Sequence, residues 1–186
     1  MARGKTKGGE FERETMRRIT TVFAKFGISP TDAFRSILSG GHKESFGDIS
    51  LSSSLAALFP FAVECKWYKK LDLYKLLLPW DKMGKSNLFR QWWIQTLEGA
   101  EKSKTLYPLL VFKANNKETF CMLYYGDFWR VLRVPIEEID IPFIKQICNG
   151  RVLLCFRFGH LLKLLAHKAK KGNNNGKISS DKRSRV

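Results

Sequence analysis

The chain has 186 residues, 44% of them hydrophobic, and a formal net charge of +16 from 33 Lys and Arg against 17 Asp and Glu. This length and apolar content predict one folded domain with its own core, and 13% aromatic residues exclude a wholly disordered basic protein. So large an excess of positive charge predicts a polyanionic partner.

The positive charge is not confined to the C-terminal tail. Residues 163–186 hold eight basic residues and one acid, so they contribute +7, and the rest of the chain contributes +9. The folded part of the protein is therefore expected to be basic as well.

Cysteine usage and apolar runs indicate a reducing compartment. No two of the four cysteines form a CxxC motif, and no histidine lies at zinc-finger spacing from them. Three of the four lie in strand-like apolar runs, so we expect buried, reduced thiols. The polar N-terminus lacks the apolar segment of a signal peptide. The longest uncharged apolar run, 55–63, is too short to span a bilayer. We expect an intracellular, cytoplasmic protein with no membrane segment.

The first third of the chain predicts a helix followed by two strands. Residues 1–8 are a basic, glycine-containing arm, and apolar residues at steps of three and four predict a helix over 9–26 that ends at Gly27. The segments 33–39 and 46–51 predict two strands joined by the loop "GGHKE".

The rest of the chain predicts further strands and helices around a mixed sheet. The run 55–67 predicts a third strand, and Pro79 and Gly84 interrupt the basic, aromatic segment 68–85. The remaining predictions are a helix over 86–104 opened by a Ser or Asn cap, strands over 108–114, 119–125 and 128–134, a short helix over 135–147, a strand over 151–158, a basic helix over 160–171 and a disordered, low-complexity tail over 172–186. This order indicates an α/β domain.

The sequence "FAVECKW" (61–67) alternates in a way that gives the predicted strand two different faces. Glu64 and Lys66 lie on one face, and apolar residues with Cys65 lie on the other. Taken alone, E-x-K in a strand is a common coincidence and favours a surface ion pair. The alternative is that the pair faces a reaction site.

Two more carboxylates lie where apolar residues are expected. Glu12 continues the apolar stripe of the first helix backward by one step of four. Taken alone, it is better explained as a first-turn carboxylate that complements the helix dipole or pairs with Arg13 or Arg17. Asp48 lies within the strand "FGDISL", where Asp is depleted, and could also be a turn or edge residue.

The three carboxylates together point to a metal site. Two carboxylates about 4 Å apart repel by roughly 1 kcal/mol in water and about 4 kcal/mol at an effective dielectric constant of 20, so a cluster needs a proton or a cation. Hard oxygen ligands select Mg²⁺ or Mn²⁺. Such an ion can bind a phosphodiester oxygen and lower the pKa of its water, and Lys66 beside it could orient that water.

The motifs "GGEFERE", "GDISL" and "FAVECKW", in this order, resemble the PD-(D/E)XK nuclease superfamily and within it the archaeal and phage Holliday junction resolvases. The resemblance covers about residues 8–125. It implies a restriction-endonuclease-like core, a mixed β-sheet flanked by helices in the order αβββαβ, over 9–135, with 136–171 as a C-terminal extension of the same domain. The segment 67–87 and everything after about 127 have no assigned counterpart.

By the same resemblance Glu12, Asp48 and Glu64 are metal ligands, the Cys65 backbone carbonyl is a further ligand, and Lys66 is the catalytic lysine. The implied activity is a Mg²⁺-dependent (or Mn²⁺-dependent) structure-specific DNA endonuclease that makes paired nicks in four-way junctions, acts as a homodimer and leaves 5′-phosphate ends. Two alternatives stay open: another PD-(D/E)XK nuclease of restriction or repair type, and a non-catalytic nucleic-acid-binding protein.

The residues expected to contact DNA are basic residues or lie in the loop before Asp48. Because they would bind phosphates, we expect the affinity for DNA to depend on salt concentration. They are Arg13, Arg17, His42, Lys43, Ser45, Lys69, Lys70 and Lys85. Trp92 and Trp93 are adjacent in a helix, so we expect one of them to face a partner chain or DNA, the alternative being a helix buried on two sides.

Overall fold

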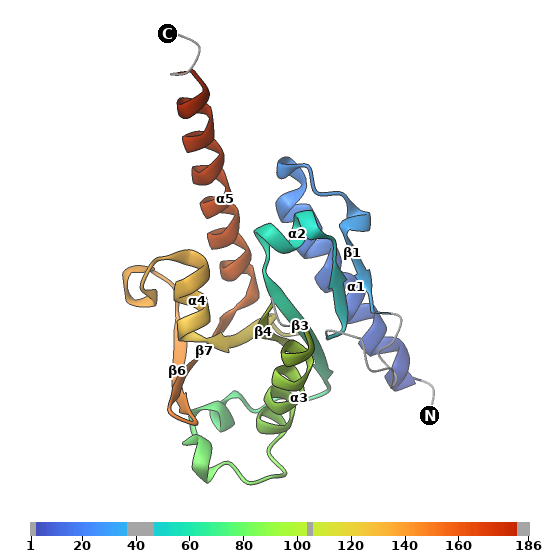
Figure 1. Ribbon diagram of the computed structural model, residues 1–186. Helices are drawn as coiled ribbons and strands as arrows, with labels where there is room; N and C mark the ends of the chain where they lie inside the picture. The colour runs from blue at the N-terminus through green and yellow to red at the C-terminus, as the bar shows by residue number, and fades with distance from the viewer. Residues whose placement is uncertain (1–2, 37–46, 104–105, 182–186) are drawn as a thin grey trace.

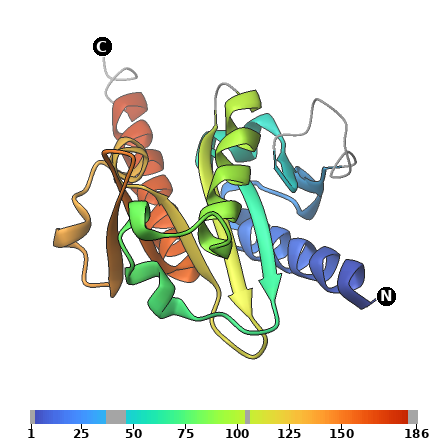
Figure 2. The same cartoon turned by 90° about the horizontal axis from the view of Figure 1, so that it is seen from below.

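The computed structural model describes residues 3–36, 47–103 and 106–181. Its centre is a seven-stranded mixed sheet in the order β1-β2-β3-β4-β5-β7-β6, in which β3 and β4 are parallel and every other described pair is antiparallel. Figure 1 shows α1 and α5 beside the sheet and α3 below it, and Figure 2 shows β3 and β4 running side by side in the same direction. The predicted mixed sheet flanked by helices, as in a restriction-endonuclease-like fold, is confirmed, with a short helix added between β2 and β3 to the predicted αβββαβ order.

The first helix, α1 (Arg3–Phe23), is longer than predicted. It begins six residues before Gly9, so the segment predicted as a basic arm is helical from Arg3 onward. Its buried stripe contains Ile19 and Phe23, as the periodicity predicts. A short 3₁₀ turn follows, and Gly27 closes it with a φ of 83°, a conformation that favours glycine.

Three strands and a short helix follow α1. The strands are β1 (Ala33–Arg35), β2 (Ile49–Leu51) and β3 (Phe61–Tyr68). The third strand was predicted to begin at residue 55, but Ser53–Leu58 is the helix α2. The Ser52 side chain accepts a hydrogen bond from the Leu55 N–H and caps this helix, which explains the difference.

The segment between β3 and the next helix contains only 3₁₀ turns, at Leu73–Leu77 and Trp80–Lys82, as its proline and glycine predict. The helix α3 (Leu88–Ser103) begins where expected, and the Asn87 side chain accepts hydrogen bonds from the Phe89 and Arg90 N–H groups.

The prediction that Trp92 or Trp93 is exposed is wrong. Their exposed fractions are 8% and 0%. Leu76, Trp80 and Met83 of the preceding segment pack in the same apolar cluster and cover the side of α3 that a bare helix would present to solvent. The helix is therefore buried on two sides, and the aromatic segment before it is part of the core.

The C-terminal half extends the same sheet rather than forming a separate one. Its strands are β4 (Tyr107–Ala114), β5 (Phe120–Tyr124), β6 (Phe143–Cys148) and β7 (Arg151–Arg157). Of the predictions for this half, the strands at 108–114, 119–125 and 151–158 are confirmed.

Two predictions in this half are wrong. The strand expected over 128–134 is largely the helix α4 (Tyr125–Leu132), because its buried residues Phe128, Val131 and Leu132 follow helical spacing despite their high strand propensity. The short helix expected over 135–147 is one 3₁₀ turn, Ile136–Glu138, followed by β6, which gains its hydrogen bonds by pairing with β7.

The last helix, α5 (Phe158–Asp181), covers the predicted basic helix and continues ten residues past its expected end. The continuation includes the start of the segment predicted as disordered. Adding residues to a helix already held by packing costs little, and no proline interrupts it.

All four cysteines are free thiols, and Cys121, Cys148 and Cys155 are buried. Among the described residues, no helix is both long and apolar enough to cross a lipid bilayer.

Candidate active site

The backbone places Asp48 against β3. Gly47 has a φ of 90°, and a Cβ at this position would lie 2.5 Å from the Val63 carbonyl oxygen, so only glycine fits. The Asp48 N–H donates to that same oxygen at 2.8 Å, and its carboxylate Oδ2 accepts from the Cys65 N–H at 2.8 Å. Asp48 is therefore held by Val63 and Cys65, the two residues of β3 that flank Glu64.

The alternation in β3 gives its two faces different surroundings. Phe61 and Val63 belong to the apolar cluster that contains α1 residues, whereas Glu64 and Lys66 point to the other face. The Lys66 ammonium lies 2.6 Å from the Glu64 carboxylate, and their side chains are 25% and 14% exposed. The predicted placement of the pair on one face of a strand is confirmed, and the pair is largely shielded from water rather than a surface pair.

Glu12 reaches this region from α1. It is buried, and its carboxylate pairs with the guanidinium of Arg35 on β1. Gly9, one turn earlier in α1, lies beside that guanidinium, and a Cβ there would be in van der Waals contact with it at 3.4 Å. Glu12 therefore does not sit in an open first turn, and a cation compensates its burial.

The three carboxylates influence one another. Burial and the negative charges of Glu64 and, less strongly, Glu12 together raise the pKa of Asp48 to about 7, although the Cys65 N–H and Lys66 act in the opposite direction. Burial also raises the pKa of the Cys65 thiol, together with the charges of Asp48, Glu12 and Glu64. Glu12 of α1, Asp48 directly before β2 and Glu64 of β3 thus share one electrostatic environment.

The donor set suits a hard divalent cation. Within the described ranges, no three His, Cys, Asp or Glu side chains are grouped closely enough to hold a metal ion as they stand. The reason is visible in their partners, since Glu12 faces Arg35, Glu64 faces Lys66 and Asp48 faces a backbone N–H. Carboxylate oxygens are nevertheless the ligands that Mg²⁺ and Mn²⁺ prefer, and an added positive charge would offset the repulsion that raises the pKa of Asp48.

The predicted DNA contacts fall into two groups. The described ones are exposed basic side chains and can reach a ligand: Arg13, Arg17, Lys69, Lys70 and Lys85. His42, Lys43 and Ser45 lie outside the described residues. The Cys65 carbonyl stays a predicted ligand, and the structure adds that the Cys65 N–H is already used by Asp48.

Two residues of this region were not singled out from the sequence. Arg35 gave no signal, because a single arginine in a short strand has no pattern. Gly47 could have been found, since a glycine directly before an Asp in a strand marks a close approach of two backbones.

Comparison with known proteins identifies a family for this chain. Residues 3–162 match the model of the family described as "Phage putative PDDEXK endonuclease". No curated protein and no solved structure matches the chain significantly.

Proposed function

Because the chain belongs to this phage PDDEXK endonuclease family, and is thus a nuclease of the PD-(D/E)XK type, we propose that it is a Mg²⁺- or Mn²⁺-dependent DNA endonuclease with Glu12, Asp48, Glu64 and Lys66 as its catalytic residues. One observation carries the proposal. Asp48 is held by the backbone of β3, and its burial and the negative charges of Glu64 and Glu12 raise its pKa to about 7 against the opposing effect of Lys66.

Each residue has a distinct role in this proposal. Asp48, Glu64 and Glu12, with the Cys65 carbonyl, would hold the divalent ion. When bound, the ion supplies positive charge at the scissile phosphate and lowers the pKa of a water. Lys66, 2.6 Å from Glu64, is close enough to orient a water or to offset negative charge that develops at phosphorus. In-line hydrolysis would leave 5′-phosphate and 3′-hydroxyl ends.

The finer proposal concerns the substrate. The motifs "GGEFERE", "GDISL" and "FAVECKW" resemble those of the Holliday junction resolvases, which supports four-way DNA junctions as the substrate. Paired nicks across a branch need two active sites, so we propose a homodimer. β6 is an edge of the described sheet, and Ile147 on it is 68% exposed, which makes this edge a candidate for the dimer contact.

The decisive experiment is cleavage of a labelled four-way junction with Mg²⁺ or with chelator. We expect Asp48→Asn and Glu64→Gln each to abolish cutting while junction binding in chelator persists, because neither residue is needed to hold the phosphate backbone. Cutting by a contaminant-free double variant would refute the assignment.

Two further measurements define the substrate and the assembly. Junction, flap and linear duplex are compared at one salt concentration, and equal rates on all three would leave a nuclease without junction preference. Sedimentation equilibrium should give about twice the 21.5 kDa mass of one chain, and a monomer bound to a junction would contradict the paired-nick proposal.

A further inference from the structure

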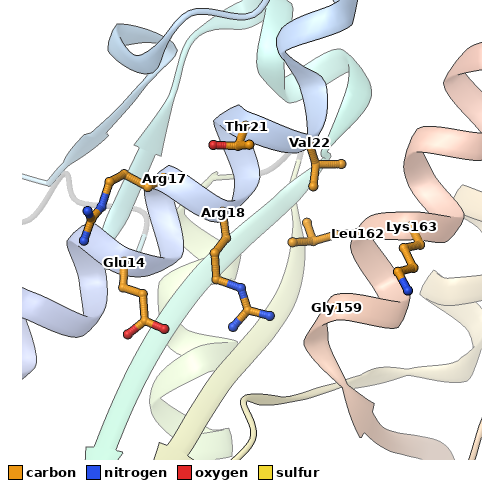
Figure 3. Close-up of a pocket in the computed structure, with 8 residues that line it drawn as sticks. All are labelled: Glu14, Arg17, Arg18, Thr21, Val22, Gly159, Leu162 and Lys163. Atoms are coloured by element: carbon orange, nitrogen blue, oxygen red, sulfur yellow. The ribbon is translucent and has the colours of Figure 1, made fainter.

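A groove separates α1 from α5 (Figure 3). Its volume is about 540 Å³, within the range of ordinary ligand sites. It is lined by Glu14, Arg17, Arg18, Thr21, Val22, Gly159, Leu162 and Lys163. Glu12, Asp48, Glu64 and Lys66 do not line this groove, and of the predicted DNA contacts that the structure describes it contains Arg17.

The groove lies on a different flank of α1 from Glu12. Glu12 pairs with Arg35 of β1, at one edge of the sheet, whereas Glu14 pairs with Lys113 of β4, a central strand. Arg18 follows Glu14 by four positions and therefore lies one turn further along the same flank. A ligand in the groove would thus be separated from Asp48 and Glu64 by the body of α1.

The groove combines an apolar floor with cationic sides. Val22 of α1 and Leu162 of α5 face each other, and Arg18 extends from α1 into the space between the helices, with Lys163 across from it (Figure 3). The guanidinium of Arg18 is held 5.4 Å from the centre of the Phe158 ring, and a Cβ on Gly159 would still only touch it, at 3.6 Å. Arg18 is therefore positioned in advance, which reduces the entropy lost on binding an anion.

The charge of the groove is positive even though it contains an acid. Glu14 is engaged by the Lys113 ammonium at 2.5 Å, so its charge is compensated. Arg17 and Arg18 have no acid after them in α1, and residues 158–171 of α5 contain four lysines and no acid. One of these, Lys168, donates to the Val131 carbonyl, and Lys163 is exposed at the groove.

We propose that the α1–α5 groove is a second DNA-binding site, which holds a short stretch of sugar–phosphate backbone away from the cleavage site. Arginine and lysine on the sides suit phosphate oxygens, and the apolar floor suits the face of a sugar. The inference takes from the proposed function only that DNA is the ligand. Its test measures binding in chelator and needs no cleavage.

The experiment compares paired variants by fluorescence anisotropy on a labelled 30-base-pair duplex and on a four-way junction over a range of salt. Arg18→Gln/Lys163→Gln removes the two facing charges, and Arg18→Lys/Lys163→Arg keeps them. The matched control is Lys75→Gln/Lys117→Gln, which removes two exposed charges outside the groove. Because Arg18 packs on Phe158, a variant of exposed residues alone, Arg17→Glu/Lys163→Glu, guards against loss of folding.

For Arg18→Gln/Lys163→Gln and Arg17→Glu/Lys163→Glu we expect the affinity for DNA to fall by about tenfold or more at about 150 mM salt. The slope of log affinity against log salt concentration should be smaller by about 2, since each lost phosphate contact contributes about 0.9. The charge-preserving variant and the control should stay within about twofold of the wild type. Equal losses in groove and control variants would overturn the inference, because they would show a general charge effect.

A competition with poly-glutamate distinguishes DNA from an acidic protein as the ligand. If groove variants lose poly-glutamate binding and keep DNA binding, the groove serves an acidic protein and the inference fails. If the groove variants lose DNA affinity but the wild type cuts no DNA, this inference stands and the proposed function fails. If the wild type cuts DNA but the groove variants bind it as tightly as the wild type, the proposed function stands and this inference fails.

Discussion

Two aspartates, the half-buried Asp48 and the buried Asp127, lie in opposite kinds of surroundings. Burial is the main reason that the pKa of each is raised. Around Asp48, Glu64 and Glu12 add to the increase. Around Asp127, at the start of α4, Arg151 and Arg130 counteract it from 3.5 and 3.7 Å.

The difference separates a carboxylate that still needs a cation from one that the chain already neutralises. The charge of the Asp127 carboxylate is compensated by Arg151 and Arg130, so this residue needs no bound cation. The pKa increase of Asp48 is opposed by the neutral Cys65 N–H and by the charge of Lys66, and the Lys66 ammonium lies against Glu64. Desolvation alone therefore does not identify a site, and the sign of the neighbouring charges does.

The largest expected effect is on the rate of DNA cleavage, which should depend on the surroundings of Asp48 and not on those of Asp127. We expect Lys66→Gln to lower the single-turnover rate of junction cleavage by about 10²–10³-fold, the loss typical of one group that stabilises charge in the transition state. Asp127→Asn, the matched change in the other region, should leave the rate within about threefold. Equal losses in the two variants would mean that Lys66 acts through folding, and thermal melting of both proteins checks this.

The second expected effect concerns pH and stability in chelator. The Asp48 pKa is about 7 in the folded protein and near 3.8 in the unfolded chain, so between these values the folded state binds the extra proton and stability falls as pH rises. Asp48→Asn removes this loss. Its free energy of unfolding relative to wild type should increase by about 2–4 kcal/mol between pH 5 and pH 8.

Urea titrations of both proteins at pH 5, 6.5 and 8 measure this difference. A constant difference across the three pH values would show that Asp48 titrates normally. Addition of Mg²⁺ at pH 8 should stabilise the wild type more than Asp48→Asn, because binding to the folded state alone adds free energy by mass action.

The smallest expected effect tests the neutralised aspartate. Arg151→Gln leaves the buried Asp127 carboxylate with Arg130 alone and should cost about 1–2 kcal/mol at pH 7, less than a fully buried pair because both arginines are largely exposed. In an Asp127→Asn background the same change should cost markedly less. A double-mutant cycle by urea denaturation gives the coupling, and a coupling near zero would contradict the comparison.

Part of the site follows from local pattern. The period of two in "FAVECKW" places Glu64 and Lys66 on one face of a strand, and the step of four in the first helix places Glu12 beside the core. Gly27 and Asn87 act at helix ends as their residue types predict. These features depend only on backbone geometry, which neighbouring residues determine.

Other features needed contacts between distant segments. The exposure of Trp92 was predicted wrongly because the covering residues Leu76 and Trp80 come from an irregular segment without periodicity. The helix α4 was predicted as a strand because aromatic and β-branched residues have high strand propensity, and packing of Phe128 and Val131 overrode that preference. The Arg35 partner of Glu12 comes from another element and has no sequence signal.

By itself the sequence determined which residues are acidic, basic and apolar and on which face of its own helix or strand each one lies, because those faces follow from the repeat of the backbone. Only the tertiary structure decided that Gly47 brings Asp48 against the Cys65 N–H and that α5 lies beside Arg18. Burial and Coulomb interactions depend on distance in space, and no local pattern fixes the distance between segments far apart in the chain.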